Sequence, residues 1–437
     1  MLCPDQVAHV FIPGKNWRLS LAEVVAFLTA RRVHFKVDEL SKSFFVVASE
    51  TSPYLTAINS LGGTIKIGRV LFHSSSETVR DAFLGKEKQA QEEIRQRLSS
   101  TDVFSQLFEN PPQKIMFGVS VYFESPFFLR FSKKIQRFIG GSLKNELASR
   151  GTKARFMGFH KNRRAPQLTH VEVLRKRLTG NGTEILFCVG RRQTFVSKTI
   201  SVHDPFEFQR RDISRPIQRK IYSIPPRLAR VMINLSGCLP EKTLLDPFCG
   251  VGTILQEALL AGSRAIGMDI DPWCVRASCI NLDWLKNQYA IKDPRYSVFL
   301  GDSRKLTAKI GKETVDCIAT EPDLGPPLLH CPTESYAKRI TNKLEPLYFN
   351  FIEGAYEILR PGGNLVFVTP WIRTRSGDFI TLDFRGKTEA LGFKVVPLPK
   401  KEILGDDVPD TEMRTELPLV DIGTRHRIGR RINALQK

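Results

Sequence analysis

The sequence has 437 residues, with 65 Lys and Arg against 45 Asp and Glu, which gives a net charge of +20. This length predicts two or three domains. No apolar run approaches the ~20 residues that a membrane-spanning helix requires, and no signal-like segment opens the chain. We therefore expect a soluble, cytoplasmic protein with no membrane partner.

The eight cysteines argue against two kinds of site. None of them forms a C-x2-C pair, and the closest two, Cys274 and Cys279, suit neither a zinc knuckle nor a redox pair. Several lie inside apolar runs, where cysteine behaves as a small hydrophobic residue. We expect reduced thiols and no bound metal.

The positive charge is concentrated in one part of the chain. Residues 130–220 contain 22 Lys and Arg against 6 Asp and Glu, a net charge of +16. An excess of this size favours a polyanionic partner such as a nucleic acid. A solvated basic surface without a partner is the alternative.

Residues 1–85 predict a ferredoxin-like α/β domain. The strand and helix patterns follow the order β-α-β-β-α-β, with strands expected at 8–12, 33–37, 44–48 and 65–72 and helices at 20–30 and 53–61. Ser20 and Glu23 have the spacing of a capping box at the start of the first helix. No cluster of catalytic residue types occurs here, so we expect a structural role.

Residues 86–203 predict a second α/β unit. A charged helix at 86–98 and a turn at 110–112 resemble a linker to it. Its strands are expected at 114–123, 171–175, 184–189 and 194–202.

The second unit also carries the basic residues that we expect to contact RNA. A long helix at 126–149 and a basic run at 161–164 provide Lys133, Lys134, Arg137, Arg163 and Arg164. Phe residues are interleaved with them, as in surfaces that combine phosphate contacts with base stacking. Each Phe taken alone is explained more simply by the core.

Residues 204–226 form a basic connector, to which we assign two more RNA contacts, Arg211 and Arg215. Its prolines predict a semi-rigid linker rather than a flexible one. From residue 227 to 437 strands and helices alternate, which predicts a parallel, doubly wound sheet. Segments 391–397 and 417–421 are expected to close this sheet as an antiparallel pair, and a basic tail at 425–431 follows.

The connector leads into a strand and a glycine loop, Leu244-Leu245-Asp246-Pro247-Phe248-Cys249-Gly250-Val251-Gly252-Thr253. Gly250 and Gly252 allow close approach of a ligand to the backbone, and the helix that follows presents free N–H groups. A P-loop would end in Gly-Lys-Ser/Thr, and a dinucleotide loop would read G-x-G-x-x-G; neither pattern is present. The loop resembles motif I of RNA and DNA amino-methyltransferases, which bind S-adenosylmethionine; an ordinary Gly-rich turn is the alternative.

Acidic residues follow four successive strands, at Asp246, Asp269, Asp302 and Glu321. Asp269 lies 19 residues after Gly250, near the spacing of a carboxylate that binds ribose hydroxyls. Asp302 is placed to accept from the adenine amino group, and Asp246 to complement the methionine ammonium. Each Asp could instead be a helix N-cap, although four caps together are less expected.

The upstream Arg-Asp-x-x-Arg-Pro and Pro-Pro-Arg-Leu-Ala-Arg motifs resemble a narrower group. This group is the archaeal and eukaryotic tRNA guanine-10 N2-methyltransferases, built from a ferredoxin-like domain, a THUMP domain that grips tRNA, a linker and a Rossmann-fold catalytic domain. The resemblance implies that the cofactor is S-adenosylmethionine and that tRNA is the partner. The sequence does not indicate a protein partner, and we expect a monomer. It implies a cofactor site made of Asp246, Phe248, Gly250, Gly252, Thr253, Asp269, Ile270, Asp302 and Ser303.

One motif departs from the family. The family carries Asp-Pro-Pro-Tyr-Gly after the fourth strand, and here the residues are Glu321, Pro322, Asp323, Leu324 and Gly325. By resemblance, the first side chain and the next carbonyl accept hydrogen bonds from the exocyclic amine and so orient it. We expect Glu321 and Pro322 to keep these roles.

The other two changes in this motif alter the contacts offered to the base. Leu324 removes an aromatic face for a flipped base, and Asp323 either replaces a contact or retunes the pocket. The predicted function is therefore methylation of a guanine N2 amine in tRNA. The alternatives are another tRNA position or RNA, and a non-catalytic RNA-binding protein.

Overall fold

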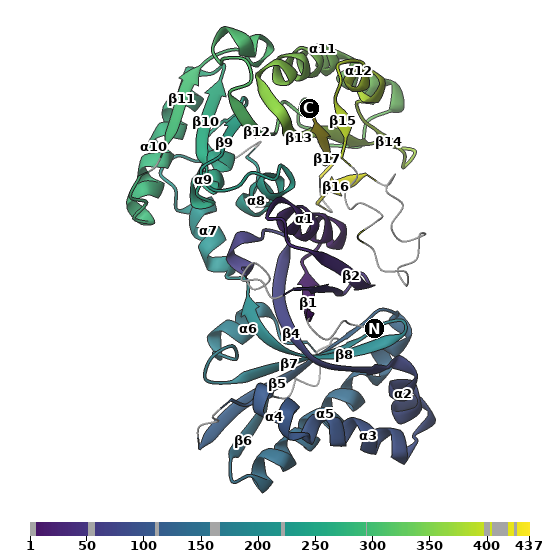
Figure 1. Ribbon diagram of the computed structural model, residues 1–437. Helices are drawn as coiled ribbons and strands as arrows, with labels where there is room; N and C mark the ends of the chain where they lie inside the picture. The colour runs from purple at the N-terminus through teal and green to yellow at the C-terminus, as the bar shows by residue number, and fades with distance from the viewer. Residues whose placement is uncertain are drawn as a thin grey trace.

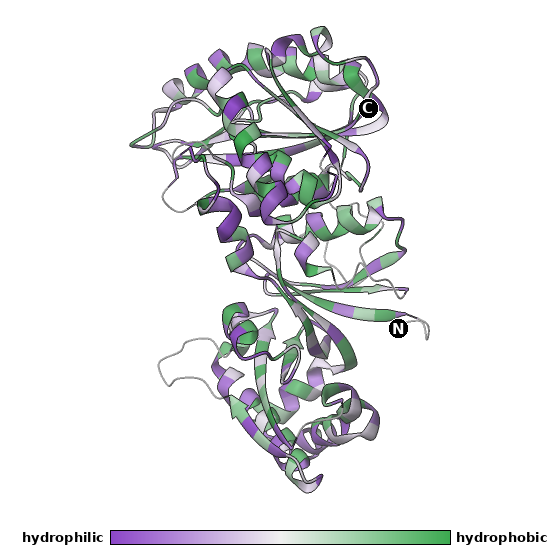
Figure 2. Ribbon diagram, turned by 90° about the vertical axis from the view of Figure 1, so that its left-hand side faces the viewer, coloured by the Kyte–Doolittle hydropathy of each residue, from purple (hydrophilic) through white to green (hydrophobic). Residues whose placement is uncertain are grey.

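The computed structural model describes residues 6–50, 57–109, 113–157, 167–219, 223–293, 295–396, 403, 418–423 and 426–437. Two β-sheets organise these residues into an elongated molecule of three stacked bodies (Figures 1 and 2). The C-terminal α/β body lies at one end, and the two N-terminal units share the other sheet. This arrangement confirms the predicted α/β class.

The first unit forms four strands of an eight-stranded sheet in the order β2-β3-β1-β4, all antiparallel. Its elements are β1 (Val7–Pro13), α1 (Trp17–Ala30), β2 (Phe35–Leu40), β3 (Phe45–Ser49), the 3-10 helix η2 (Ile58–Ser60) and β4 (Thr64–Ser75). The strand order is the one that a ferredoxin-like β-α-β-β-α-β unit produces. Part of the expected helix at 53–61 lies outside the described residues, and the remainder is the short η2.

The second unit continues the same sheet, because the long strand β4 pairs with β8 and gives the order β4-β8-β7-β5-β6. Its strands are β5 (Lys114–Phe123), β6 (Lys153–Met157), β7 (Thr183–Val189) and β8 (Gln193–Val202). Its helices are α2 (Ser76–Arg80), the π-helix η3 (Asp81–Gly85), α3 (Lys88–Ser99), α4 (Thr101–Leu107), the 3-10 helix η4 (Pro126–Phe131), α5 (Ser132–Ser149) and α6 (His170–Arg175).

The C-terminal body is a doubly wound sheet with the strand order β11-β10-β9-β12-β13-β17-β15. Its strands are β9 (Thr243–Asp246), β10 (Arg264–Asp269), β11 (Tyr296–Leu300), β12 (Val315–Thr320), β13 (Leu359–Arg373), β14 (Phe379–Ile380), β15 (Lys394–Val395), β16 (Leu419–Asp421) and β17 (Ile428–Gln436). The helices are α7 (Pro205–Ile213), α8 (Pro226–Leu235), α9 (Thr253–Leu260), α10 (Pro272–Gln288), η5 (Ser303–Ala308), α11 (Glu334–Ile358) and α12 (Arg385–Ala390).

The five strands from β11 to β13 are parallel, and β17 runs antiparallel to β13. The carboxyl ends of β9 to β12 therefore meet at one edge, where ligands bind in open α/β sheets.

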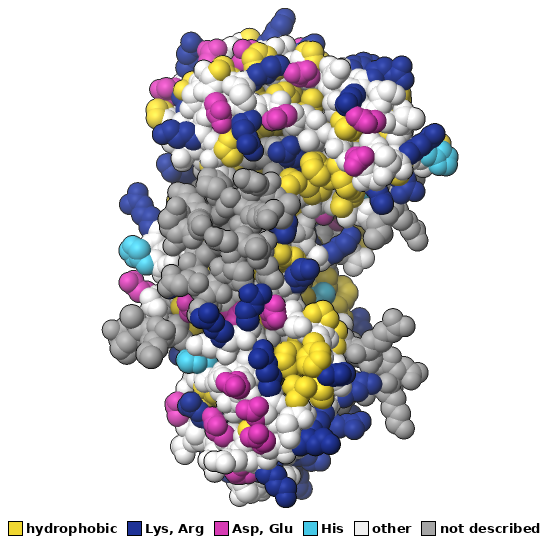
Figure 3. All heavy atoms as spheres, turned by 90° about the vertical axis from the view of Figure 1, so that its right-hand side faces the viewer, with side chains coloured by type: hydrophobic (Ala, Val, Ile, Leu, Met, Phe, Trp, Pro, Cys, Tyr) yellow, Lys and Arg dark blue, Asp and Glu magenta, His cyan; other side chains and the backbone are white. Residues whose placement is uncertain are grey.

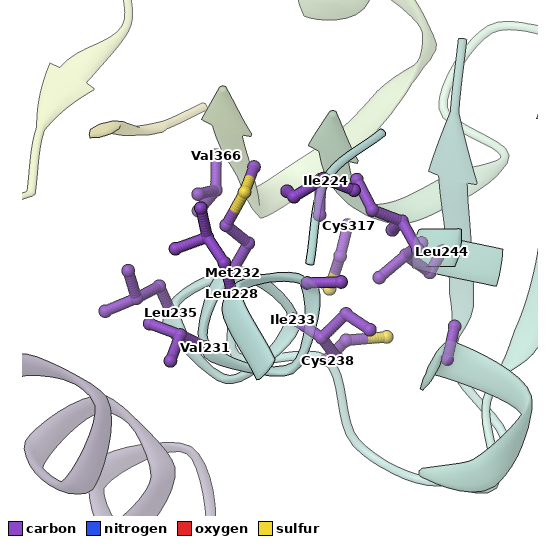
Figure 4. Close-up of a cluster of buried hydrophobic side chains, with 14 of the residues drawn as sticks. Ile224, Leu228, Val231, Met232, Ile233, Leu235, Cys238, Leu244, Cys317 and Val366 are labelled. Atoms are coloured by element: carbon purple, nitrogen blue, oxygen red, sulfur yellow. The ribbon is translucent and has the colours of Figure 1, made fainter. Parts of the chain in front are cut away.

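Helix α8 joins the two sheets. Met232 and Ile233 are fully buried in the cluster that also contains Leu244 of β9 and Val366 of β13 (Figure 4). Leu19 and Ala22 of α1 complete the same cluster. The N-terminal unit and the C-terminal body thus share one hydrophobic core.

Several local predictions were wrong. Residues 171–175 form helix α6 rather than a strand, because Thr169 and Glu172 build a capping box there. Helix α1 begins at Trp17 with Asn16 as its N-cap, so Ser20 and Glu23 are buried inside the helix. The expected linker helix at 86–98 is α3, which packs its Ile94 and Leu98 into the core of the second unit.

The end of the chain also differs from the prediction. The strand that closes the sheet is β17, which contains the second half of the expected basic tail. Residues 394–395 and 419–421 contribute only the short strands β15 and β16 beside it. The tail is thus part of the sheet.

Candidate active site

The strand ends bring two carboxylates into one cavity. Asp246 ends β9, and Glu321 directly follows the neighbouring strand β12. The cavity has an empty volume of about 380 Å³. It is lined by Arg219, Ser223, Ile224, Asp246, Phe248, Cys249, Gly250, Val251, Thr253, Ile254 and Glu321.

The glycine loop forms the floor of this cavity. Gly250 and Gly252 have φ angles of +53° and +86°, which glycine adopts without a steric penalty. The Gly250 N–H donates to Asp269 Oδ2 at 2.8 Å, and the Asp271 N–H donates to Asp269 Oδ1 at 2.9 Å. Asp269 therefore supports the loop from the next strand, at the edge predicted from its spacing to Gly250.

Asp246 is buried in the cavity wall with 2% of its surface exposed. Its Oδ1 accepts from the Thr320 hydroxyl at 2.6 Å and from the Phe248 N–H at 3.2 Å. Burial raises the pKa of Asp246 to about 7, although these two hydrogen bonds oppose the rise. A carboxylate held in this way favours a cationic ligand group, because a nearby positive charge stabilises its ionised form.

Glu321 is bound by an arginine from the end of the chain. Arg430 Nε on β17 donates to Glu321 Oε1 at 2.9 Å, and the two side chains are 13% and 10% exposed. Glu321 Oε2 is buried and has no hydrogen-bond partner among the described residues. Burial raises the pKa of Glu321, and the Arg430 charge opposes this rise.

The other residues of the altered motif, Pro322 to Gly325, lie outside the cavity lining. Pro322 is buried, whereas Asp323 is exposed and its Oδ1 accepts from the Gly325 N–H at 2.9 Å. The Tyr348 hydroxyl donates to the Asp323 carbonyl at 2.9 Å, which fixes the backbone of this turn. Leu324 packs partly buried against the core cluster. Pro322, Asp323 and Leu324 are absent from the cavity lining. Within the altered motif, Glu321 is therefore the residue that lines the cavity.

The predicted adenine end is more open. Asp302 is the N-cap of η5 and binds Arg304, whose hydrogen bond lowers the pKa of Asp302. Ser303 is buried behind it. Ile270 and Leu300, at the ends of β10 and β11, are 66% and 50% exposed. These apolar side chains next to Asp302 suit a flat heteroaromatic ligand.

The two predicted RNA contacts in the connector are wrong. Arg211 is 5% exposed, and its Nε donates to Glu257 Oε1 at 2.5 Å. Arg215 is 3% exposed, and its guanidinium donates to Thr253 Oγ1 at 2.6 Å and Ser223 Oγ at 2.8 Å. Both arginines fasten the connector to helix α9, which leaves neither of them free for a phosphate.

The sequence analysis did not predict Cys249, Val251 and Ile254 of the lining, which lie in or beside the glycine loop, nor four residues outside that loop. Arg219, Ser223 and Ile224 of the connector line the cavity, and Arg430 binds Glu321. The proximity of the Arg-Asp-x-x-Arg-Pro motif to the glycine loop could have indicated the three connector residues. Nothing in the sequence indicates Arg430, which is 109 residues from Glu321.

The predicted RNA surface lies far from the cavity, on α5 of the second unit. Lys133, Lys134 and Arg137 are exposed there, and Lys134 Nζ also donates to the Phe83 carbonyl at 3.1 Å. Figure 3 shows Lys and Arg side chains beside exposed hydrophobic ones on this end of the molecule. Arg163 and Arg164 lie outside the described residues.

The described residues contain no group of three or more His, Cys, Asp or Glu side chains that could hold a metal ion. None of their helices is both long and apolar enough to cross a bilayer.

The parallel strands and the glycine loop at their carboxyl edge define a Rossmann-like α/β fold. Residues 216–375 match the family described as "RMKL-like, methyltransferase domain", and residues 76–278 match a family described as "DNA methylase". The structure of TrmN from Thermus thermophilus superimposes with a TM-score of 0.51 over 99% of both chains, at 15% identity. At that identity the superposition supports the fold alone.

The chain is similar in sequence to tRNA (guanine(10)-N2)-dimethyltransferases of two archaea. It is 32% identical to the Pyrococcus abyssi protein over 230 residues, and 37% identical to the Methanothermobacter thermautotrophicus protein over 160 residues. These matches cover 52% and 36% of this chain, and 60% and 42% of the two relatives. The predicted resemblance to this group is thereby confirmed for roughly half of each chain.

Proposed function

We propose that this protein transfers a methyl group from S-adenosylmethionine to the exocyclic N2 amine of a guanine in tRNA. The observation that carries the proposal is the cavity in which Asp246 and Glu321 meet beside the glycine loop. The sequence similarity to tRNA (guanine(10)-N2)-dimethyltransferases supports this substrate and favours position 10.

The residues of the cavity and of the neighbouring strand ends fit the cofactor; Asp269, Ile270, Leu300 and Asp302 belong to the strand ends and do not line the cavity. The backbone at Gly250 faces open space, since a Cβ built there meets no atom within 4 Å. Asp246 supplies a buried anionic partner for the cofactor's ammonium group, and Asp269 supplies acceptors for its ribose hydroxyls. Ile270 and Leu300 offer apolar surface for the adenine, with Asp302 as an acceptor at its edge.

The bound cofactor supplies an electrophilic methyl group. Glu321 accepts a hydrogen bond from the target amine, which turns the nitrogen lone pair toward that methyl group. The Pro322 carbonyl, which is expected to share this role by resemblance, does not line the cavity. The protein then acts mainly by positioning the two reactants, a contribution that is large when their geometry is fixed. The burial of Glu321 strengthens its interaction with the amine, because the local dielectric is low.

The N-terminal half supports the same function. We propose a ferredoxin-like unit at 1–85, a THUMP-like unit at 86–203 that binds tRNA through Lys133, Lys134 and Arg137, a connector at 204–226 and the catalytic domain at 227–437. The exposure of these three basic residues on α5 supports the RNA role. A tRNA-modifying enzyme of this kind would act in the cytoplasm.

Methyl transfer by Glu321 variants tests the proposal. The protein is incubated with labelled cofactor and unmodified tRNA, and the RNA is digested to nucleosides. We expect Glu321→Gln to retain partial activity, because it keeps an acceptor oxygen, and Glu321→Ala to lose nearly all activity. Affinity for cofactor and tRNA should change little, as expected for an interaction strongest in the transition state.

Two results would contradict this proposal. Full activity of Glu321→Ala would remove Glu321 from the reaction. Absence of N2-methylguanosine after incubation of the wild-type protein would favour an RNA-binding protein without methyl-transfer activity.

A further inference from the structure

The strongest unexplained feature of the site is the contact between the last strand and the altered motif. Arg430 lies on β17, opposite Pro370 of β13, and reaches across to Glu321 after β12. Both side chains are nearly buried. An ion pair in this environment is costly to assemble, because both groups lose their hydration. Its position beside the cavity indicates a role in the chemistry.

The contact uses only half of the carboxylate. Arg430 Nε donates to Oε1, whereas Oε2 has no hydrogen-bond donor among the described residues. A buried acceptor without a partner is unfavourable, and such atoms are rare in folded proteins. The vacant Oε2 belongs to a side chain that lines the cavity. It is therefore an unused acceptor beside the cavity; because the atom itself is buried, a donor group of the substrate reaches it through a local movement of its neighbours.

The surrounding charges make Arg430 decisive for the state of this carboxylate. The charged and titratable groups that interact with Glu321 are Arg430, Asp421 of β16, Asp246 of β9 and Tyr348 of α11. Arg430 is the cation of this group, and the two Asp residues oppose ionisation of Glu321 when they are charged. Without Arg430, burial and like charge would both favour the protonated acid.

We propose that Arg430 is a positioning residue that holds Glu321 ionised and oriented, so that its Oε2 accepts a hydrogen bond from the target amine. This inference rests on the proposed function of Glu321. It gives the C-terminal strand a part in catalysis beyond closing the sheet. A glutamate in place of the family's aspartate has one more methylene, and the Arg430 contact restricts that longer side chain.

The kinetic test compares Arg430→Met with Arg430→Lys. We expect Arg430→Met to lower kcat by about 100-fold, the size of effect that a small misplacement of a reacting group produces. The KM for tRNA and the Kd for S-adenosylmethionine should stay unchanged. Arg430→Lys should recover part of the activity, because it keeps the charge but loses the guanidinium geometry. The acidic limb of the pH profile should move to higher pH in Arg430→Met.

Two controls separate positioning from general stability. Arg360 binds Asp316 at the opposite end of β12, at 2.8 Å, so Arg360→Met removes a more exposed arginine–carboxylate contact of the same strand, far from the cavity, and should leave kcat unchanged. In a Glu321→Gln background, Arg430→Met should cause little further loss, since the neutral amide no longer requires the cation. Wild-type kcat in Arg430→Met, or an equal loss in both backgrounds, would overturn the inference.

A measurement without substrate tests the ion pair independently of activity. Infrared difference spectra of Arg430→Met against Arg430→Met/Glu321→Gln should show a protonated-carboxyl band at neutral pH, and wild type against Glu321→Gln should not. Absence of the band in Arg430→Met, or its presence in the wild type, would overturn the inference even if the wild-type protein methylates tRNA. If the wild type produces no N2-methylguanosine, the proposed function fails, and the infrared result alone decides the role of Arg430 toward Glu321.

Discussion

At the scale of single residues, the site depends on how buried carboxylates are held. Asp246, Asp269 and Glu321 end or follow neighbouring strands, yet each has a different partner: a threonine hydroxyl, two backbone N–H groups and an arginine. These partners give the three carboxylates three different hydrogen-bonding environments. The environments match the cationic, hydroxyl and amine groups that the proposed substrates would present.

The affinity for S-adenosylmethionine should depend on pH through Asp246. Because burial raises its pKa to about 7, Asp246 is protonated below that value and ionised above it. The cofactor's ammonium group favours the ionised form, so binding should release a proton and weaken by about tenfold per unit as the pH falls below 7. Calorimetry on both sides of pH 7 measures this slope. Asp246→Asn should bind weakly with a flattened profile; an unchanged slope would exclude Asp246 as the titrating group.

Asp269 should contribute to cofactor affinity in two ways. Its carboxylate accepts from the Gly250 and Asp271 N–H groups and is placed to accept ribose hydroxyls. Asp269→Ala should therefore weaken S-adenosylmethionine binding by more than tenfold, since loss of a hydrogen bond to a charged group costs about 1.5–3 kcal/mol. Calorimetry on the folded variant gives the value. The affinity of Asp302→Ala for S-adenosylmethionine is the comparison. Asp302 is also a predicted cofactor acceptor, but it is paired with Arg304 and does not support the glycine loop. Wild-type affinity in Asp269→Ala would refute its assignment.

At the scale of elements, the connector packs as part of the C-terminal body. Glu257 of α9 is fully buried and binds both Arg211 of α7, at 2.5 Å, and Arg230 of α8, at 2.8 Å. Asn281 of α10 also holds the connector, accepting from the Ile217 N–H at 2.9 Å. These contacts place Ser223 and Ile224 against the cavity.

Removal of the Glu257 carboxylate should weaken the packing of α7 and α8 against α9. Glu257→Ala leaves two arginines buried without their anion, so we expect the catalytic domain to lose about 3–5 kcal/mol of stability. Urea unfolding followed by tryptophan fluorescence measures the loss. Glu357→Ala breaks the exposed pair with Lys312 and should change stability by less than about 1 kcal/mol. Equal stability of the two variants would show that the buried triad contributes little.

The elements also show what the sequence could predict. The positions of the glycine loop and of the acidic strand ends could be predicted from the sequence, because strand and helix patterns are local and alternate along the chain. Helix α6 was missed because the capping role of Thr169 was overlooked beside an alternating pattern. The burial of Arg211 and Arg215 depends on Glu257 and Thr253, about forty residues away. A basic side chain near an RNA-binding unit therefore does not reveal whether it faces solvent.

At the scale of the whole molecule, the first unit connects the proposed RNA-binding unit to the C-terminal body through a shared core and direct hydrogen bonds. Glu23 of α1 accepts from the Gly62 and Gly63 N–H groups and from Asn234 of α8, all within 2.7 Å. Arg227 Nε donates to the Gly62 carbonyl at 2.7 Å across the same contact. The shared sheet then extends from this contact through β4 and β8 to α5. The basic surface of α5 and the cavity are thus linked by one continuous sheet and the α1–α8 contact.

This arrangement predicts how tRNA binding depends on salt. If Lys133 and Arg137 each neutralise one phosphate, Lys133→Ala/Arg137→Ala should lower the slope of log K against log salt by about two, since each contact contributes roughly one. Binding assays on the full chain at several salt concentrations measure the slope. The KM for tRNA should rise, whereas S-adenosylmethionine affinity should not change. Lys242→Ala/Arg264→Ala removes two exposed charges from the amino ends of β9 and β10 and should leave the slope unchanged. Equal slopes in all three proteins would show that α5 presents a solvated basic surface and that tRNA binds elsewhere.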